Sequence, residues 1–287
     1  MSHQVELIRE MSMALGEGPV WLADRRELAF VDIVGGAVHR WSPAKRQLHT
    51  IHVDAAPTFV VPAAGAALLV GAGSGIYHLK ADGLGRCVAE IDQPRTNRTN
   101  DATVDCHGRL WFGTMDENAA EPTGAVWRLD HNGLARTGIA AVITNGPACN
   151  PSGTLLYDVD TVARTIFCSK VTEGGKLVDR EPFIQIAPAD GYPDGVTVDA
   201  EGCLWVALWD GWAVRRYSPA AELLEEVRFP CARVTKIAFG GDDLQTAYAT
   251  TARVGLSEDQ LQHQPLAGSL FAFDVGVPGI ITQPVSI

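Results

Sequence analysis

Four short segments, 15–21, 97–102, 143–148 and 191–196, each contain an acid or an amide, namely Glu17, Asn100, Asn145 and Asp194, which in three of the segments lies beside glycine or proline. Each of these side chains lies 10 or 11 residues before a leucine that begins an apolar run. Two carboxylates and two amides that met around one axis would repel unless a cation compensated them, and hard divalent ions prefer all-oxygen ligands. The matched spacing therefore predicts a divalent-cation site.

A simpler interpretation exists for any one segment. Asn145-Gly146 and Asp194-Gly195 are dipeptides that commonly form turns without any further role. Only the recurrence of the same spacing in four places favours the metal hypothesis over four independent turns. We expect the four segments to be loops that just precede strands.

Internal repeats indicate which elements would hold these side chains. Residues 103–111 and 197–205 are identical at six of nine positions and lie 94 residues apart, and 150–157 repeats the same turn-then-strand pattern between them. Weaker copies complete six units, whose anchors are 40 to 49 residues apart: Leu28, Leu68, Leu110, Leu155, Leu204 and Thr246. A period of this length is typical of a propeller.

Short alternating segments at 37–43, 75–79, 124–130, 213–219 and 268–273 predict a further strand in most units. We therefore predict an all-β fold: a six-bladed β-propeller with four antiparallel strands per blade, and residues 1–287 as a single domain. The alternative is a pair of β-sandwiches. Helical periodicity is weak and is confined to stretches such as 219–227. In a propeller the loops at one end converge on the central channel, which is where function is expected.

Charge and composition exclude several function classes. The chain has a net charge of −11, which repels nucleic acid and anionic membrane surfaces. Charges at Glu6, Arg9 and Glu10 interrupt any export signal, and no apolar run reaches membrane-spanning length, so we expect a cytoplasmic protein. The six cysteines form no C-x-x-C pair, which favours unpaired thiols.

Other catalytic patterns are missing from the sequence: it has no G-x-S-x-G elbow, no H-E-x-x-H and no G-x-G-x-x-G. Four tryptophans fall inside the repeats and are expected in blade cores, namely Trp41, Trp111, Trp127 and Trp205. Trp209 and Trp212 flank Asp210-Gly211 and are expected to wall the pocket.

The segments that carry a family resemblance are, in order, 15–21, 98–102, 108–115, 144–147, 193–195 and 251–253. Through them the chain resembles the gluconolactonase and regucalcin family of six-bladed propellers over essentially its whole length. The resemblance implies that Glu17, Asn145 and Asp194 bind one divalent cation and that Arg98 and Asn100 contact substrate. Some members hold substrate hydroxyls with a Glu three residues after Gly-Thr-Met, where this chain has Asn118. Glu117 is the expected substitute, with Glu121 as the alternative.

The resemblance further implies hydrolysis of a sugar lactone to its aldonic acid. The cation would be Ca²⁺, Zn²⁺, Mg²⁺, Mn²⁺ or Fe²⁺, and Asp194 would serve as both metal ligand and catalytic proton acceptor or donor. Two alternatives stay open: hydrolysis of other esters or phosphotriesters at the same ion, and a non-catalytic calcium-binding propeller. The expected partner is a small-molecule sugar lactone, and no sequence feature fixes the oligomeric state.

Overall fold

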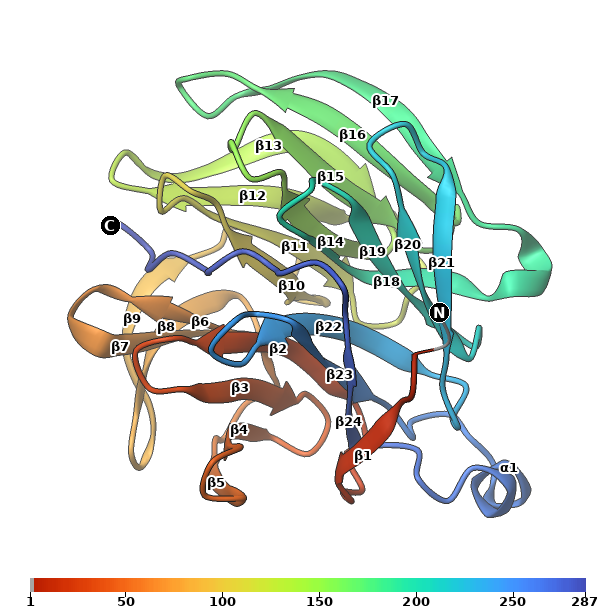
Figure 1. Ribbon diagram of the computed structural model, residues 1–287. Helices are drawn as coiled ribbons and strands as arrows, with labels where there is room; N and C mark the ends of the chain where they lie inside the picture. The colour runs from red at the N-terminus through yellow and green to blue at the C-terminus, as the bar shows by residue number, and fades with distance from the viewer. Residues whose placement is uncertain (1–2) are drawn as a thin grey trace.

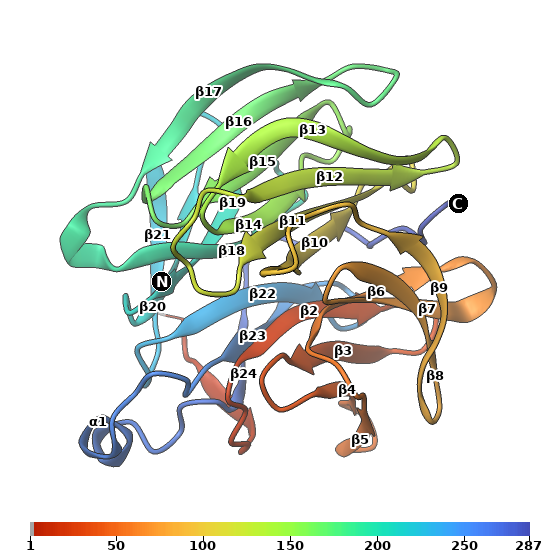
Figure 2. The ribbon, with the colours of Figure 1, turned by 180° about the vertical axis from the view of Figure 1, so that it is seen from behind.

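Six four-stranded antiparallel sheets stand around a common axis in the computed structural model, which describes residues 3–287 (Figures 1 and 2). The all-β six-bladed propeller predicted from the repeats is confirmed. All six anchors lie at the first or second residue of the second strand of a blade, directly after the turn that follows the inner strand. None of the described helices is long and apolar enough to cross a membrane.

Each blade is a meander whose first strand lines the axis. The first three blades, from the inner to the outer strand, are β2 (Gly16–Leu22), β3 (Glu27–Asp32), β4 (Ala37–Ser42) and β5 (Gln47–His52); β6 (Pro57–Ala63), β7 (Ala67–Ala72), β8 (Gly75–Lys80) and β9 (Gly83–Glu90); and β10 (Asn97–Val104), β11 (Leu110–Asp116), β12 (Gly124–Asp130) and β13 (Gly133–Ala141). The next two are β14 (Thr144–Cys149), β15 (Leu155–Asp160), β16 (Thr165–Val171) and β17 (Leu177–Gln185); and β18 (Tyr192–Val198), β19 (Leu204–Trp209), β20 (Ala213–Tyr217) and β21 (Leu223–Arg228).

The last blade closes the ring with both ends of the chain. Its order is β22 (Val234–Gly240), β23 (Thr246–Thr251), β24 (Leu270–Asp274) and finally β1 (Glu6–Arg9), which pairs antiparallel with β24. The repeat analysis did not predict this closing strand, because β1 is outside the first repeat.

A short helix, α1 (Glu258–His263), precedes β24 and begins with a capping box at Ser257. The weak helical pattern at 219–227 was misleading: β21 occupies most of it, and Val227 packs in the blade core. Two 3-10 turns, Ala64–Ala66 and Pro188–Asp190, complete the regular elements.

The identical residues of the repeats have a structural reason. Asp105 and Asp199 are both buried, and each accepts hydrogen bonds from two backbone amides of the following turn and from the Nε1 atom of a tryptophan, Trp111 or Trp205, at 2.8 and 3.0 Å. Each aspartate thus joins the turn to the core of its own blade. The four tryptophans expected in blade cores are buried, and the six cysteines are unpaired.

The C-terminal segment runs across the centre of the ring (Figure 1). Val285 donates its amide to the carbonyl of Pro62, and Ser286 donates to Gly108. These contacts join the segment to two different blades. Ile280 and Thr282 of the same segment line a small cavity together with residues of the inner strands, so the segment covers this end of the axis. The functional cavity opens at the other end.

Candidate active site

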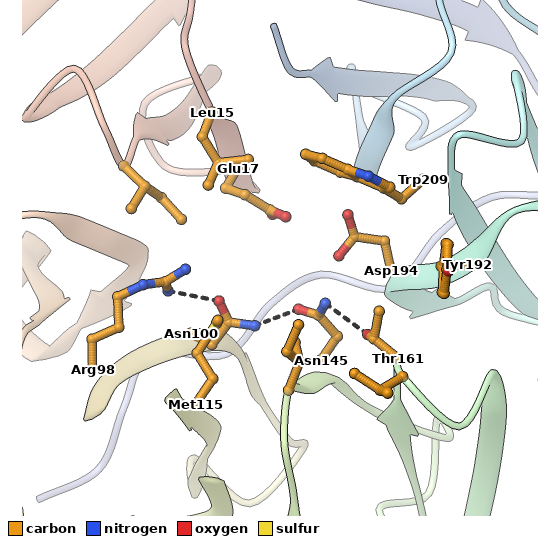
Figure 3. A pocket seen from close by; sticks show the side chains of 13 residues that line it. Leu15, Glu17, Arg98, Asn100, Met115, Asn145, Thr161, Tyr192, Asp194 and Trp209 are labelled. Atoms are coloured by element: carbon orange, nitrogen blue, oxygen red, sulfur yellow. Dashed lines mark hydrogen bonds between the residues drawn. The ribbon is translucent and has the colours of Figure 1, made fainter. Parts of the chain in front are cut away.

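A cavity of about 320 Å³ lies on the axis, and Glu17, Asn100, Asn145 and Asp194 all line it together with Arg98. The four side chains come from β2, β10, β14 and β18, the inner strands of four blades. Figure 3 shows the ends of Glu17, Asn145 and Asp194 facing one common space, with the guanidinium of Arg98 at its side. The side chains that the matched spacing predicted to meet are therefore brought together.

Their segments are not loops, contrary to the sequence expectation. All four belong to inner strands, and each residue lies at or inside a β-bulge where two residues fall out of register with the second strand. A bulge turns a side chain away from the normal alternation, here into the channel. Asn-Gly and Asp-Gly pairs were read as turns because a bulge uses the same residue types.

Two glycines show why these bulges need their residues. Gly146 has φ +67°, a left-handed conformation that favours glycine. A Cβ atom on Gly195 would come within 2.7 Å of the carbonyl oxygen of Thr235 on the neighbouring blade. The bulge beside Asn145 thus requires a residue that can adopt positive φ. The bulge beside Asp194 requires a residue without a Cβ atom, because the neighbouring blade approaches its backbone closely.

The other two inner strands, β6 and β22, have shorter bulges that carry Thr58 and Thr235. Both threonines are buried. Thr58 is hydrogen-bonded to the hydroxyl of Thr99 at 2.7 Å, and Thr235 donates to the carbonyl of Gly16 at 2.6 Å. These two bulges therefore join neighbouring blades, and the four longer ones supply the cavity.

A chain of hydrogen bonds fixes the amides. The Nη1 atom of Arg98 donates to Oδ1 of Asn100 at 2.7 Å, and Nδ2 of Asn100 donates to Oδ1 of Asn145 at 2.6 Å. Nδ2 of Asn145 then donates to the hydroxyl of Thr161 at 3.0 Å, which donates to the carbonyl of Pro193 at 3.0 Å (Figure 3). Because Nδ2 of Asn145 donates to Thr161, its Oδ1 atom faces Asn100, from which it accepts a hydrogen bond.

The two cavity carboxylates are electrostatically strained. Burial, together with the negative charge of Asp101, raises the pKa of Glu17 to about 8. Burial, together with the charge of Glu17, also raises the pKa of Asp194 well above its usual value. Glu17 accepts one hydrogen bond, from the amide of Gly18 at 2.8 Å. Within residues 3–287, no protein group donates to Asp194.

A buried ion pair lies behind this site. Nζ of Lys236, on β22, donates to Oδ1 of Asp101 at 2.6 Å and to the carbonyl of Ala102 at 3.0 Å. Both side chains are almost completely buried. The sequence analysis assigned no role to either residue. The available signal was a lone lysine in the apolar run 234–239 and an acid directly after Asn100.

The donor set fits a divalent cation. Glu17 and Asp194 are two buried carboxylates that destabilise each other's charge, and Asn145 adds a fixed amide oxygen, which together match the all-oxygen preference of a hard ion. Across the described chain, no cluster of three or more His, Cys, Asp or Glu side chains could hold a metal. The predicted ligand set is not such a cluster, because its third member, Asn145, is an amide.

The remaining predicted residues have mixed positions. Glu117 is exposed and does not line the cavity. Burial lowers the pKa of Arg98, and the negative charge of Glu117 is the largest influence that opposes this shift. Trp209 lines the cavity as expected. Trp212 is 39% exposed and is not part of the lining, so the expectation that it walls the pocket is wrong.

Comparison with known proteins agrees with this architecture. The chain is 34% identical over 284 residues to a 6-deoxy-6-sulfogluconolactonase of Pseudomonas putida, covering 97% of each chain. It is also 34% identical to a pentonolactonase of Haloferax volcanii, covering 96% of each. Among solved structures, a regucalcin from Agrobacterium tumefaciens, described as a calcium-binding protein, superposes with a TM-score of 0.93 at 24% identity, covering 100% of this chain and 98% of that one.

A family model described as the SMP-30/gluconolactonase/LRE-like region matches residues 15–253. That span begins two residues before Glu17 and contains all four longer bulges, and it ends in the loop after β23. The chain therefore belongs to the SMP-30/gluconolactonase/LRE-like family.

Proposed function

We propose that this protein is a metal-dependent sugar lactonase that hydrolyses an aldonolactone to its aldonic acid. The observation that carries the proposal is the convergence of Glu17, Asn145 and Asp194 on one cavity that Arg98 also lines. Relatives named as lactonases for several sugars support the reaction class. The cavity volume is in the range of small-molecule sites.

Glu17, Asn145 and Asp194 would hold the ion, which when bound would polarise the ester carbonyl and lower the pKa of water. Its identity among Ca²⁺, Zn²⁺, Mg²⁺, Mn²⁺ and Fe²⁺ is part of what the experiment must determine. In the reaction, the oxygen of water bonds to the acyl carbon and the ring C–O bond breaks. The former ring oxygen takes a proton and becomes a hydroxyl.

Asp194 is the residue we assign to proton transfer. Its carboxylate accepts no hydrogen bond from the described chain, whereas Glu17 is engaged by the amide of Gly18. Asp194 is therefore free to accept the proton of the attacking water. Arg98 is held by Asn100 on one nitrogen and by the carbonyl of Thr99, and its remaining N–H groups can orient the lactone oxygens. Glu117 stays a predicted substrate contact.

Because four different blades supply the site, we further propose that residues 1–287 act as one domain. The cytoplasmic location predicted from the sequence also stays a prediction.

The test is proton release from a panel of pentono- and hexonolactones, using protein stripped with chelator and resupplied with single divalent ions. We expect turnover restored by at least one ion. Glu17→Gln and Asp194→Asn should each reduce it by more than about a hundredfold, whereas the same changes at exposed Glu173 and Asp24 should not.

Failure of every lactone, with an ion nevertheless bound, would reject the lactonase. A panel of other esters and phosphotriesters under the same conditions then separates the other-hydrolase alternative from a calcium-binding propeller without catalysis.

A further inference from the structure

The wall of the cavity is apolar, in contrast to its floor. Seven of the thirteen lining side chains are aliphatic, aromatic or thioether groups: Leu15, Ile33, Met115, Ile143, Val162, Tyr192 and Trp209. They come from four blades, and all lie near the same end of the inner and second strands as the site residues. A ligand that fills the cavity must therefore bury part of its surface against them.

The polar lining residues are largely occupied with one another. Asn100 accepts from Arg98 and donates to Asn145 and to the carbonyl of Thr144. Thr161 accepts from Asn145 and donates to the carbonyl of Pro193. Neither the Asn100 nitrogen nor the Thr161 proton remains for a ligand, whereas Asn145 keeps one free N–H group.

Apart from the Tyr192 hydroxyl and the Trp209 Nε1–H, the free hydrogen-bonding groups of the lining are at the floor. They are the carboxylate oxygens of Glu17 and Asp194, one N–H of Asn145, and the N–H groups of Arg98 that Thr99 and Asn100 do not occupy. We assign these groups to the ion and to the ester end of the lactone. Glu117, Asn118 and Glu121 are exposed and outside the lining, so no acid extends the polar floor up the wall.

Each of the two aromatic wall residues packs against an arginine that is not part of the lining. The guanidinium of Arg164 stacks over the ring of Tyr192 at 3.8 Å, and that of Arg233 lies over Trp209 at 4.7 Å. Arg164 is itself fixed to the carbonyl of Gly191, and Arg233 to Asp210. This support holds the rings as a preformed surface that does not need to order around each ligand.

A hydroxyl pressed against the aliphatic part of this wall, formed by Leu15, Ile33, Ile143 and Val162, would lose its water without gaining a partner, whereas a methyl group there would gain burial. We propose that the preferred substrates are lactones of deoxy sugars, whose group farthest from the carbonyl is a methyl rather than a hydroxymethyl or a longer polyol. This inference rests on the proposed function and specifies its substrate class.

The experiment compares lactones of identical stereochemistry that differ by one oxygen. L-Rhamnono-1,4-lactone is paired with L-mannono-1,4-lactone, and L-fucono-1,4-lactone with L-galactono-1,4-lactone. The metal-loaded protein should show a kcat/KM at least about tenfold higher for the deoxy member of a pair that it accepts, the discrimination that one group in an apolar pocket provides.

Two wall variants locate the preference. Val162→Thr and Leu15→Asn keep the side-chain size and add a polar atom, and each should reduce the deoxy preference to less than about a third of its original value. Val162 is 48% exposed, so the first change does not disturb the core. Val178→Thr is the matched control, because Val178 is 41% exposed on the outer strand β17 and should leave the ratio unchanged.

The outcomes separate the two proposals. Equal rates, or faster turnover of the hydroxymethyl members, would overturn the deoxy-sugar inference and leave the lactonase standing. A deoxy preference that neither wall variant alters would also overturn it, since the wall would then not be the cause. If the metal-loaded protein hydrolyses none of these lactones or those of the wider panel, the proposed function itself fails.

Discussion

Replacing Lys236 tests how the fold tolerates three acids around one channel. Lys236→Met removes the only charge partner of Asp101 that we observe in the described chain, at 2.6 Å, while preserving the bulk of the side chain. The Asp101 carboxylate would then be buried with one oxygen, Oδ2, already without a partner. Breaking a buried pair on one side costs about 3–5 kcal/mol of unfolding free energy.

The pH dependence gives a second, sharper readout. Burial raises the pKa of Asp101 even with Lys236 present, and the variant removes the main opposing influence. The folded state would then hold a proton that the unfolded state releases, so stability falls as pH rises. Between the folded pKa of Asp101 in the wild type and its higher folded pKa in the variant, the slope relative to wild type approaches about −1.4 kcal/mol per pH unit.

Urea unfolding at pH 6, 7 and 8 in chelator measures both effects. The double variant Lys236→Met/Asp101→Asn keeps an acceptor for the amide of Ala102 and removes the unpaired charge, so it should regain most of the lost stability and lose the slope. Equal stability of the single and double variants, or no pH slope in the single variant, would refute the idea that Lys236 compensates Asp101.

Three further predictions concern the scaffold. Burial lowers the pKa of His39 to about 4, so the stability that neutral His39 contributes is present above pH 6.5 and is lost toward pH 4. In urea unfolding at pH 4.5, His39→Gln should remove about 2.5 kcal/mol of the acid destabilisation. An equal loss of stability on acidification in both proteins would contradict this. Asp199→Ala leaves the indole N–H of Trp205 and two backbone amides without their acceptor and removes one of the three carboxylate partners of Arg216, so it should cost about 3–5 kcal/mol. The surface change Asp243→Ala should cost less than about 1 kcal/mol; similar losses would show that Asp199 is not a structural centre. Deleting residues 1–10 exposes the edge of β24 and should lower the melting temperature and promote association through that edge, as checked by calorimetry and light scattering; an unchanged monomer of equal stability would refute the need for closure.

The repeats predicted the fold because each blade buries the same core with the same turn, so the same residue types recur in the sequence. The matched spacing of Glu17, Asn145 and Asp194 predicted a common location for the same reason. The bulges were read as loops, because a bulge and a turn use the same glycines.

Other features depend on contacts between residues far apart in sequence. Lys236 meets Asp101 across the channel, and β1 meets β24 from opposite ends of the chain. The apolar wall likewise combines residues from four blades, and Ile33 and Val162 belong to none of the motifs. No local pattern identifies such partners before the ring is closed.

The closing strand has a consequence for biosynthesis. Glu6 leaves the ribosome long before its partner Ala272, which lies 266 residues further along the chain. At about 5–20 residues per second, β1 must wait unpaired for more than about ten seconds while the other blades are made. The nascent chain therefore exposes β1 without its sheet until β24 has been made. Nascent chains stalled before residue 270 should accordingly remain sensitive to proteolysis at the N-terminus and become resistant once β24 has emerged.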